Sequence, residues 1–379
     1  MVETPTTTAQ AALAGDSFAP NYRDARRAFL ETAGQACAQV WSVTHPRRGL
    51  QDETLAMDFA WLGPRLASRV LVSLSATHGV EGLYGSGCQV GFLRQQGRAA
   101  LPPDTAVLLV HGVNPFGFSW LRRVDADNID VNRNCIDWQQ SLPENPDYAL
   151  VHPMLLPAQW SPDSTLRLRL QVVELMAKWG ARRATRAITG GQYVHPEGLF
   201  FGGMGPCWSS TTLAEQARLC LNQASVIAVL DHHTGLGPEG HTEIICRHLP
   251  GSQALTLARQ WWGDDVTSPV EGQSQSEVID GNVRVALEQW CAQALVVSAA
   301  LEVGTQPSEQ VMLALVADNW LHQRGEPESP LGDAIRAQVR DAFFIDTPVW
   351  RDRAFTRAMH LYARTLAGLQ GVDTSATRP

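Results

Sequence analysis

Four apolar runs, at residues 69–74, 105–110, 225–230 and 294–301, most constrain how this chain can fold. Runs of this length that are rich in Val, Leu and Ile predict strands buried on both faces of a sheet. The stretches between them have glycine-containing or amphipathic patterns that predict helices. A strand, a helix and a second strand in that order predict a right-handed βαβ unit, so we expect an α/β fold with a parallel sheet.

Flanking segments complete the predicted domain. Residues 41–45 and 54–61 predict a strand pair, and residues 164–186 predict one long amphipathic helix. The glycine-rich stretch 188–210 predicts a long loop that either walls a pocket or only packs its aromatic side chains on the sheet. We expect a poorly ordered tail over residues 1–18, one α/β domain over 19–372, and a frayed C-terminus over 373–379.

Composition limits the classes of partner and compartment. The net charge of −8 and the pI near 5.8 argue against nucleic acid or an anionic membrane as partner. No window approaches the roughly 20 apolar residues that a spanning helix needs, and the N-terminus lacks a secretory signal pattern. Seven cysteines without CxxC spacing predict reduced thiols. We therefore expect a cytoplasmic protein, and we leave open whether it forms a homo-oligomer.

Polar residues suited to metal-assisted hydrolysis follow the apolar runs. They are His78 and Glu81, the polar segment 111–133, the pair His232 and His233, and Glu302. Because parallel strands end at the same edge of a sheet, we expect these residues to converge. Two histidines and one carboxylate with an open fourth position are typical of catalytic zinc, although an isolated HxxE is more often an ordinary turn. The spacing does not decide between the two adjacent histidines as third ligand.

The remaining candidates are a proton carrier and two anion-binding groups. We expect Glu302 to take a proton from the attacking water and pass it to the leaving amine. A guanidinium matches the two oxygens of a carboxylate, so Arg133 with Asn132 is predicted to hold an acidic end of the substrate. Arg123 is predicted to stabilise the oxyanion. Alternatively, these arginines pair internally with neighbouring acids, namely Asp125, Asp127 and Asp130.

At these motifs the sequence resembles the zinc carboxypeptidases, the carboxypeptidase A-like metallopeptidases. The resemblance is greatest to a bacterial branch with the signatures HGVEG, NPxGF, DxNRN and LExGT, which occur here as 78–82, 114–118, 130–134 and 301–305. It extends over roughly residues 70–340. It implies a mixed, mostly parallel sheet of about eight strands flanked by helices, as in phosphorylase/hydrolase-like folds.

The resemblance also implies a role for each candidate. His233 is the implied third ligand, because related deacylases read Asp-Leu-His-Thr where this chain reads Asp231-His232-His233-Thr234. The other implied roles are first and second zinc ligand for His78 and Glu81, carboxylate binding for Asn132 and Arg133, oxyanion stabilisation for Arg123 with Arg122 as competitor, and general base and acid for Glu302. Digestive members carry a mobile tyrosine before the catalytic glutamate. Here either Tyr193 substitutes for it in substrate binding, or the role is absent.

We therefore predict a zinc-dependent hydrolase with one Zn²⁺ per chain. It would cleave an amide or peptide bond next to a carboxylate in a small molecule or peptide, as a carboxypeptidase or as an N-acyl amino acid amidohydrolase. Two alternatives remain: a non-catalytic metal- or ligand-binding protein with the carboxypeptidase fold, and a metal-free α/β domain in which the histidines coincide by chance.

Overall fold

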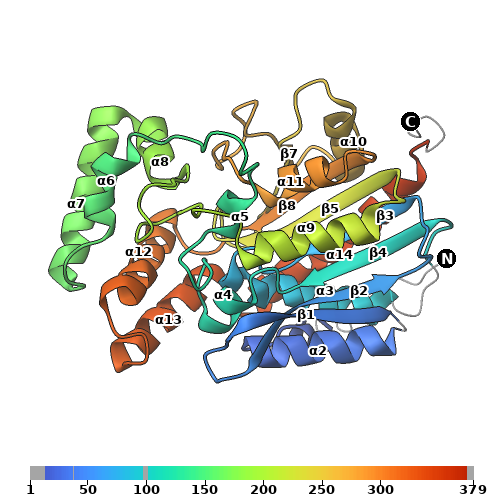
Figure 1. Cartoon of the computed structure of the whole chain (residues 1–379), viewed down its shortest axis with the longest axis horizontal. Coiled ribbons are helices and arrows are strands. Elements are labelled where there is room, and N and C mark those ends of the chain that lie inside the picture. The colour runs from blue at the N-terminus through green and yellow to red at the C-terminus, as the bar shows by residue number, and fades with distance from the viewer. Residues whose placement is uncertain (1–12, 37, 97–100, 374–379) are drawn as a thin grey trace.

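A mixed sheet of eight strands forms the centre of the molecule, in the order β1-β2-β4-β3-β5-β8-β6-β7 (Figure 1). The computed structural model describes residues 13–36, 38–96 and 101–373. The strands are β1 (Gln39–Arg48), β2 (Thr54–Leu62), β3 (Arg69–Leu74), β4 (Thr105–His111), β5 (Val226–Thr234), β6 (Thr242–Ile245), β7 (Val266–Thr267) and β8 (Leu295–Val303). The four predicted runs are the adjacent parallel strands β4, β3, β5 and β8. The predicted α/β fold with a mixed, mostly parallel sheet is confirmed.

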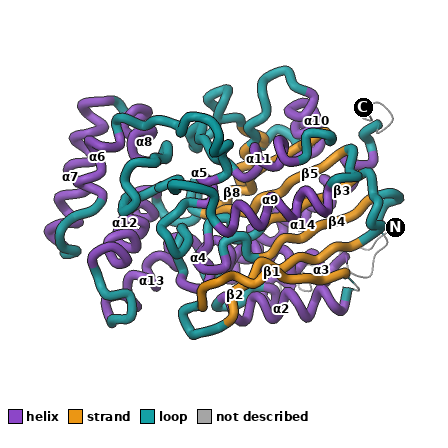
Figure 2. Tube along the Cα trace, viewed as in Figure 1, coloured by secondary structure: helices purple, strands orange, loops and turns teal. Residues whose placement is uncertain are grey.

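Helices cover both faces of this sheet because its strands alternate their side chains between two apolar layers (Figures 1 and 2). In β3, Leu71 packs in one layer, and Val70 and Val72 pack in the other. The first layer is covered by α2 (Tyr22–Gln35), α3 (Gly82–Gln96), α10 (Gln253–Trp262) and α14 (Pro348–Gln370). The second is covered by α9 (Trp208–Leu221) and α11 (Val283–Trp290).

A third apolar cluster lies beyond the carboxyl ends of the parallel strands. It joins α6 (Tyr148–Leu155), α7 (Pro162–Trp179), α8 (Ala181–Thr189), α12 (Ser308–Arg324) and α13 (Pro330–Phe343), on the left of Figure 1. Val80, from the turn that follows β3, and Phe200, from the glycine-rich segment, belong to the same cluster. The edge of the sheet at which the predicted residues converge is therefore walled by these helices.

Three predictions about local structure need correction. The predicted helix over 164–186 is two helices, α7 and α8, because Gly180 between them has a φ of 78°, which breaks the helix. The predicted tail over 1–18 is wrong for residues 13–18, since 13–17 are helical and Ala14 is buried in the core. Strands β6 and β7 were not predicted, because such short segments carry little periodicity.

Other predicted segments stand as follows. Residues 1–12 and 374–379 of the predicted termini lie outside the described residues. The glycine-rich segment is irregular from 190 to 207, between α8 and α9, with one isolated bridge between Gln192 and Phe201. The single domain over residues 19–372 stays a prediction.

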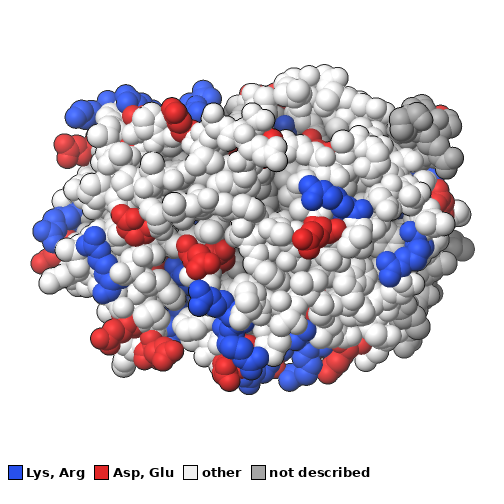
Figure 3. All heavy atoms as spheres, viewed as in Figure 1, with Lys and Arg blue, Asp and Glu red and all other residues white. Residues whose placement is uncertain are grey.

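The surface is mixed in charge. On the face shown in Figure 3, acidic and basic side chains are interspersed among wide uncharged areas. Six cysteines of the described residues are free thiols, as predicted from their spacing. Within the described parts of the chain, none of the helices combines the length and the apolar character that crossing a membrane requires.

Candidate metal centre

The first two candidate ligands lie on a tight turn that follows β3. His78 precedes the short 3-10 helix η1 (Gly79–Glu81), and Glu81 is its last residue before α3. A Cβ atom on Gly79 would lie 2.0 Å from the backbone carbon of Gly117 in α4 (Pro115–Trp120), so only glycine lets the turn pack this closely. The Gly79 amide donates to the Arg123 carbonyl at 3.1 Å. The turn is thereby fixed to the segment that carries the predicted oxyanion arginine.

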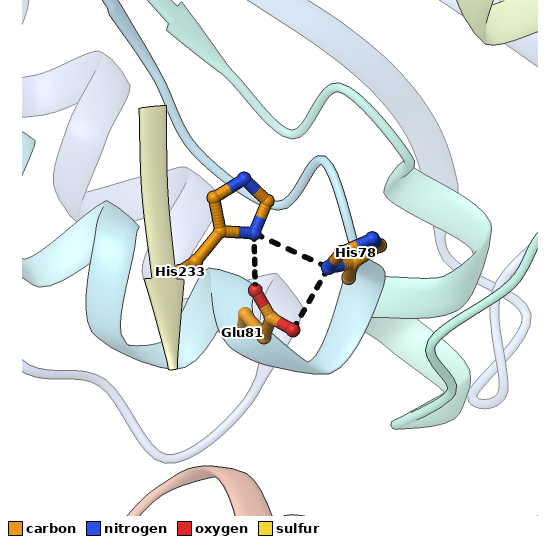
Figure 4. A group of neighbouring side chains, drawn as sticks. All are labelled: His78, Glu81 and His233. Atoms are coloured by element: carbon orange, nitrogen blue, oxygen red, sulfur yellow. Dashed lines mark hydrogen bonds and ion pairs between the residues drawn. The ribbon is translucent and has the colours of Figure 1, made fainter. Parts of the chain in front are cut away.

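Three donor atoms converge above this turn (Figure 4). His78 Nδ1 lies 2.9 Å from Glu81 Oε1, His233 Nδ1 lies 2.8 Å from Glu81 Oε2, and the two Nδ1 atoms are 3.2 Å apart. All three side chains are buried. Two ligands of one tetrahedral zinc ion at about 2.0–2.1 Å are separated by about 3.3 Å, and the three contacts, of which those to Glu81 use its two oxygens in turn, have similar lengths. The three side chains therefore form a triangle close to the size that one zinc ion requires.

The structure decides between the two adjacent histidines. His232 points to the opposite side of β5, where its Nε2 lies 2.8 Å from the hydroxyl oxygen of Tyr362. Burial lowers the pKa of His232 to about 3, so its imidazole is neutral in the core. His233 is the residue brought to His78 and Glu81, which agrees with the register implied by the family resemblance.

The donor set fits a divalent cation. His233 is within hydrogen-bonding distance of a carboxylate at both nitrogens, Glu81 at Nδ1 and Asp231 Oδ2 at Nε2 (2.7 Å). Without a metal both nitrogens must carry protons, and a metal ion at Nδ1 would take the place of one of them. Burial alone would raise the pKa of Glu81, but the imidazoles of His78 and His233 outweigh it and lower the value to about 2. The Glu81 carboxylate is therefore ionised, as a metal ligand would need to be.

Two aspartates support the histidines from outside the triangle, and the sequence analysis did not assign them this role. Asp231 accepts from His233 Nε2 and also from the Thr77 hydroxyl at 2.8 Å. Asp130 Oδ1 lies 3.4 Å from His78 Nε2. A carboxylate behind a histidine ligand fixes its tautomer and its orientation. Their positions, one residue before the histidine pair and at the start of DxNRN, were the available signal.

Glu302 lies beside His233 on the neighbouring strand. The two residues are register partners of the parallel strands β5 and β8, so their side chains emerge on the same side of the sheet. Glu302 Oε1 accepts from the Leu236 amide at 2.9 Å. Burial, together with the negative charge of Glu81, raises the pKa of Glu302 to about 7. A carboxyl group with this pKa can both accept and release a proton near neutral pH.

The structure separates Arg123 from Arg122. Arg122 is buried and pairs with Asp318 of α12, with Nε 3.1 Å from Oδ2. Arg123 is partly exposed, its Nε lies 3.0 Å from Asp130 Oδ2, and its Nη1 lies 3.8 Å from Glu81 Oε1. Arg123 is therefore the arginine at the candidate metal centre, and internal pairing with Asp130 holds it there.

Asn132 and Arg133 lie on the short helix α5 (Val131–Asn134) at the same edge. Arg133 donates to two backbone carbonyls, from Nη2 to Thr189 at 2.7 Å and from Nη1 to Asn132 at 3.2 Å. Its Nε is buried and has no hydrogen-bond partner among the described residues. The Asn132 side-chain oxygen accepts from the Val283 amide at 2.9 Å. An unpaired buried N–H group is costly, and a bound anion would relieve it.

The glycine-rich segment contacts this group of arginines. The Phe200 ring lies under both Arg123 and Arg133, with its centroid 5.2 Å and 5.5 Å from the two guanidinium carbons. The Tyr193 hydroxyl donates to the Arg133 carbonyl at 2.6 Å. Tyr193 thus binds the backbone of Arg133, and a direct role for it in substrate binding stays a prediction. The Phe200 ring therefore packs against the two arginines, and the interpretation of this segment as a pocket wall stays a prediction.

One further arginine was missed by the sequence analysis. Arg247 follows β6, and it donates to the Ile279 carbonyl. Burial, with the nearby charges of Arg284 and Arg133, lowers the pKa of Arg247 to about 10. Arg133, Arg247 and Arg284 therefore lie near one another and form a positive zone, on which the carboxylates of Asp280 and Glu288 also act. No sequence motif contains Arg247. It lies in this zone only because β6, which precedes it, occupies its position in the sheet.

Comparison with known proteins places the chain in a family. The model of the family described as "Protein of unknown function (DUF2817)" matches residues 18–357, so the chain belongs to this family. No curated protein matches the sequence.

Solved structures with a similar fold include carboxypeptidase A from Helicoverpa armigera, with 12% identity over 85% of this chain and 73% of that one and a TM-score of 0.43. The succinylglutamate desuccinylase from Chromobacterium violaceum is 14% identical over the same shares of the two chains, with a TM-score of 0.38. The matched structures thus include a carboxypeptidase A, the family that the sequence motifs resemble. Likeness of this degree does not identify a reaction, so the function proposed below rests on the site.

Proposed function

We propose that the protein is a zinc-dependent hydrolase that cleaves an amide or peptide bond next to a carboxylate. One observation carries the proposal: the two Nδ1 atoms of His78 and His233 lie 3.2 Å apart, and each lies within 2.9 Å of one oxygen of Glu81, beside the buried Glu302. These spacings are close to those between the ligands of one zinc ion. Two imidazoles and one carboxylate leave a position open, as in catalytic zinc sites. The set contains no thiolate, which structural zinc sites usually use.

Each residue around the triangle has a separate role in the proposed hydrolysis. A zinc ion bound there would polarise the substrate carbonyl and lower the pKa of a water molecule. Glu302 accepts the proton of the attacking water and then donates it to the leaving nitrogen. Arg123, held by Asp130 at 3.0 Å, donates to the carbonyl oxygen as negative charge develops on it. Helices of the third apolar cluster enclose this edge of the sheet and limit access of water.

Substrate selection follows from the positive zone. Arg133 has an unpaired buried Nε, and Asn132 precedes it on α5, so we assign the binding of a substrate carboxylate to these two residues. The C-terminal end of a peptide and an N-acyl amino acid both present an amide bond next to a carboxylate. The proposal therefore covers carboxypeptidase and amidohydrolase activity, and assays on both classes of substrate separate them.

The test compares the wild-type protein with Glu302→Gln, using exposed Glu239→Gln from the neighbouring loop as a matched control. Zinc content is measured, and hydrolysis is followed on a panel of N-acyl amino acids and short peptides, with and without a free carboxylate. We expect all three proteins to bind zinc equally. Glu302→Gln should lower kcat about 10²- to 10⁴-fold, whereas Glu239→Gln should leave it unchanged. Zinc bound by the wild type without turnover of any substrate would instead favour a non-catalytic binding protein.

A further inference from the structure

A second cluster of metal-ligand side chains joins helix α6 to the glycine-rich segment. His152 lies on α6, and His195 and Glu197 lie on the segment, more than 40 positions later in the chain. His152 Nε2 is 3.1 Å from Glu197 Oε1, and His195 Nδ1 is 4.0 Å from the same oxygen. One ligand atom of each residue lies within 4.8 Å of the others. The two imidazole rings stack at 4.2 Å and present nitrogens to one carboxylate.

We propose that His152, His195 and Glu197 bind a divalent transition-metal ion of the zinc class, at a site separate from the catalytic centre. Imidazole nitrogen and carboxylate oxygen are the donors that such ions prefer. The separations of 3.1 and 4.0 Å bracket the roughly 3.3 Å between two ligands of a tetrahedral zinc ion, so small side-chain rotations complete the set. All three side chains are partly exposed, which leaves a path for the ion and room for water ligands.

The surroundings of His152 support this assignment. Its Nδ1 is buried and lacks a hydrogen-bond partner within the described residues, and the same holds for the hydroxyl of Tyr148, one helical turn earlier. A Cβ atom at Gly198 would lie 3.1 Å from that Nδ1 and 2.6 Å from that hydroxyl oxygen, so only glycine leaves room for both groups at this position. With a metal on Nε2, the proton of His152 must lie on Nδ1, which is the buried nitrogen without a protein partner.

The bound ion would stabilise the glycine-rich segment where it contacts the arginines of the catalytic centre. Glu197 and His195 stand a few residues before Phe200, whose ring supports Arg123 and Arg133. Hydrogen bonds already hold the segment in place without a metal, since the Asn128 amide donates to the carbonyls of Pro196 and Gly198, both at 3.0 Å. The metal therefore adds rigidity to a segment that folds without it, and variants of the three ligands should remain folded.

The experiment removes the catalytic site first. Chelator-treated His233→Ala is titrated with ZnCl₂ in competition with a chromophoric chelator, alone and combined with His195→Ala or with His360→Ala. His360 is an exposed histidine on α14, so its replacement is the matched control. We expect one zinc ion per chain for His233→Ala and for the His360 double variant, and none for the His195 double variant. Hydrogen exchange of residues 190–207 should slow on zinc addition only in the first two proteins.

A second arm keeps the catalytic site intact, in case His233→Ala does not fold. The wild type should bind two zinc ions, and both His195→Ala and Glu197→Gln should bind one. Equal stoichiometry of the wild type and His195→Ala, or zinc-independent exchange of residues 190–207, would overturn the second site. Equal stoichiometry of the wild type and a folded His233→Ala would instead contradict the catalytic zinc site, so the two failures are distinguishable.

Discussion

Asp231→Asn tests the metal centre through a residue that would not touch the metal. Asp231 is fully buried, accepts from His233 Nε2 at 2.7 Å, and is itself anchored by the Thr77 hydroxyl at 2.8 Å. The carboxylate fixes the His233 tautomer that leaves Nδ1 free for the ion, and it raises the basicity of that nitrogen. An asparagine of the same shape keeps the packing but removes the charge.

The expected effect is a 10- to 100-fold weaker zinc affinity, which corresponds to about 1.4–2.7 kcal/mol. Zinc affinity is measured by competition with a chromophoric chelator, on protein whose fold is checked by circular dichroism before and after metal removal. Thr77→Val, which keeps the carboxylate but loosens it, should give a smaller loss than Asp231→Asn. Exposed Asp264→Asn should bind zinc like the wild type. A folded Asp231→Asn that binds zinc within about twofold of the wild type would refute this reasoning.

Two further predictions concern stability. Arg122→Ala should lower the free energy of unfolding by about 3–5 kcal/mol, because it leaves the buried Asp318 without its partner at 3.1 Å; urea unfolding measures this, and a change below about 1 kcal/mol would contradict it. His248 accepts from the Ser298 amide at 2.8 Å, and burial lowers its pKa to about 4. Since the unfolded chain takes up that proton near pH 6.5, stability should fall as the pH drops from about 6.5 to 4, by up to about 3 kcal/mol. His248→Gln should flatten this slope, and an unchanged slope would assign the effect to other groups.

Much of the site could be predicted because parallel strands bring distant residues to one edge. Runs that are apolar along their whole length mark strands buried on both faces, and the residue after each run then lies at the carboxyl edge. This reasoning placed His78, Glu81 and Glu302 together although β3 and β8 are far apart in the sequence. The choice of His233 over His232 needed the family resemblance, because a shift of one residue in a strand exchanges the two faces of the sheet.

The rest depended on contacts that leave no periodic signal. Arg122 and Arg123 are adjacent in the chain, and only the packing of α12 shows that Asp318 forms an ion pair with Arg122. The sequence analysis used Asp231 only as part of a motif. Its hydrogen bond to His233 depends on a distance and an angle in the folded chain, which the sequence does not show. Arg247 reaches the positive zone through β6, which is four residues long and therefore carries too little pattern to be recognised as a strand.

The triangle of donors has a consequence for the mechanics of the chain. His78 and His233 are 155 positions apart, so an ion bound by both would act as a cross-link that closes one very large loop. Such a closure restricts the unfolded chain far more than the folded one, in which β3 and β5 are already neighbours. Binding of the metal should therefore slow global unfolding in addition to completing the site. A chelator should shorten the lifetime of the native state even in a variant that cannot turn over substrate.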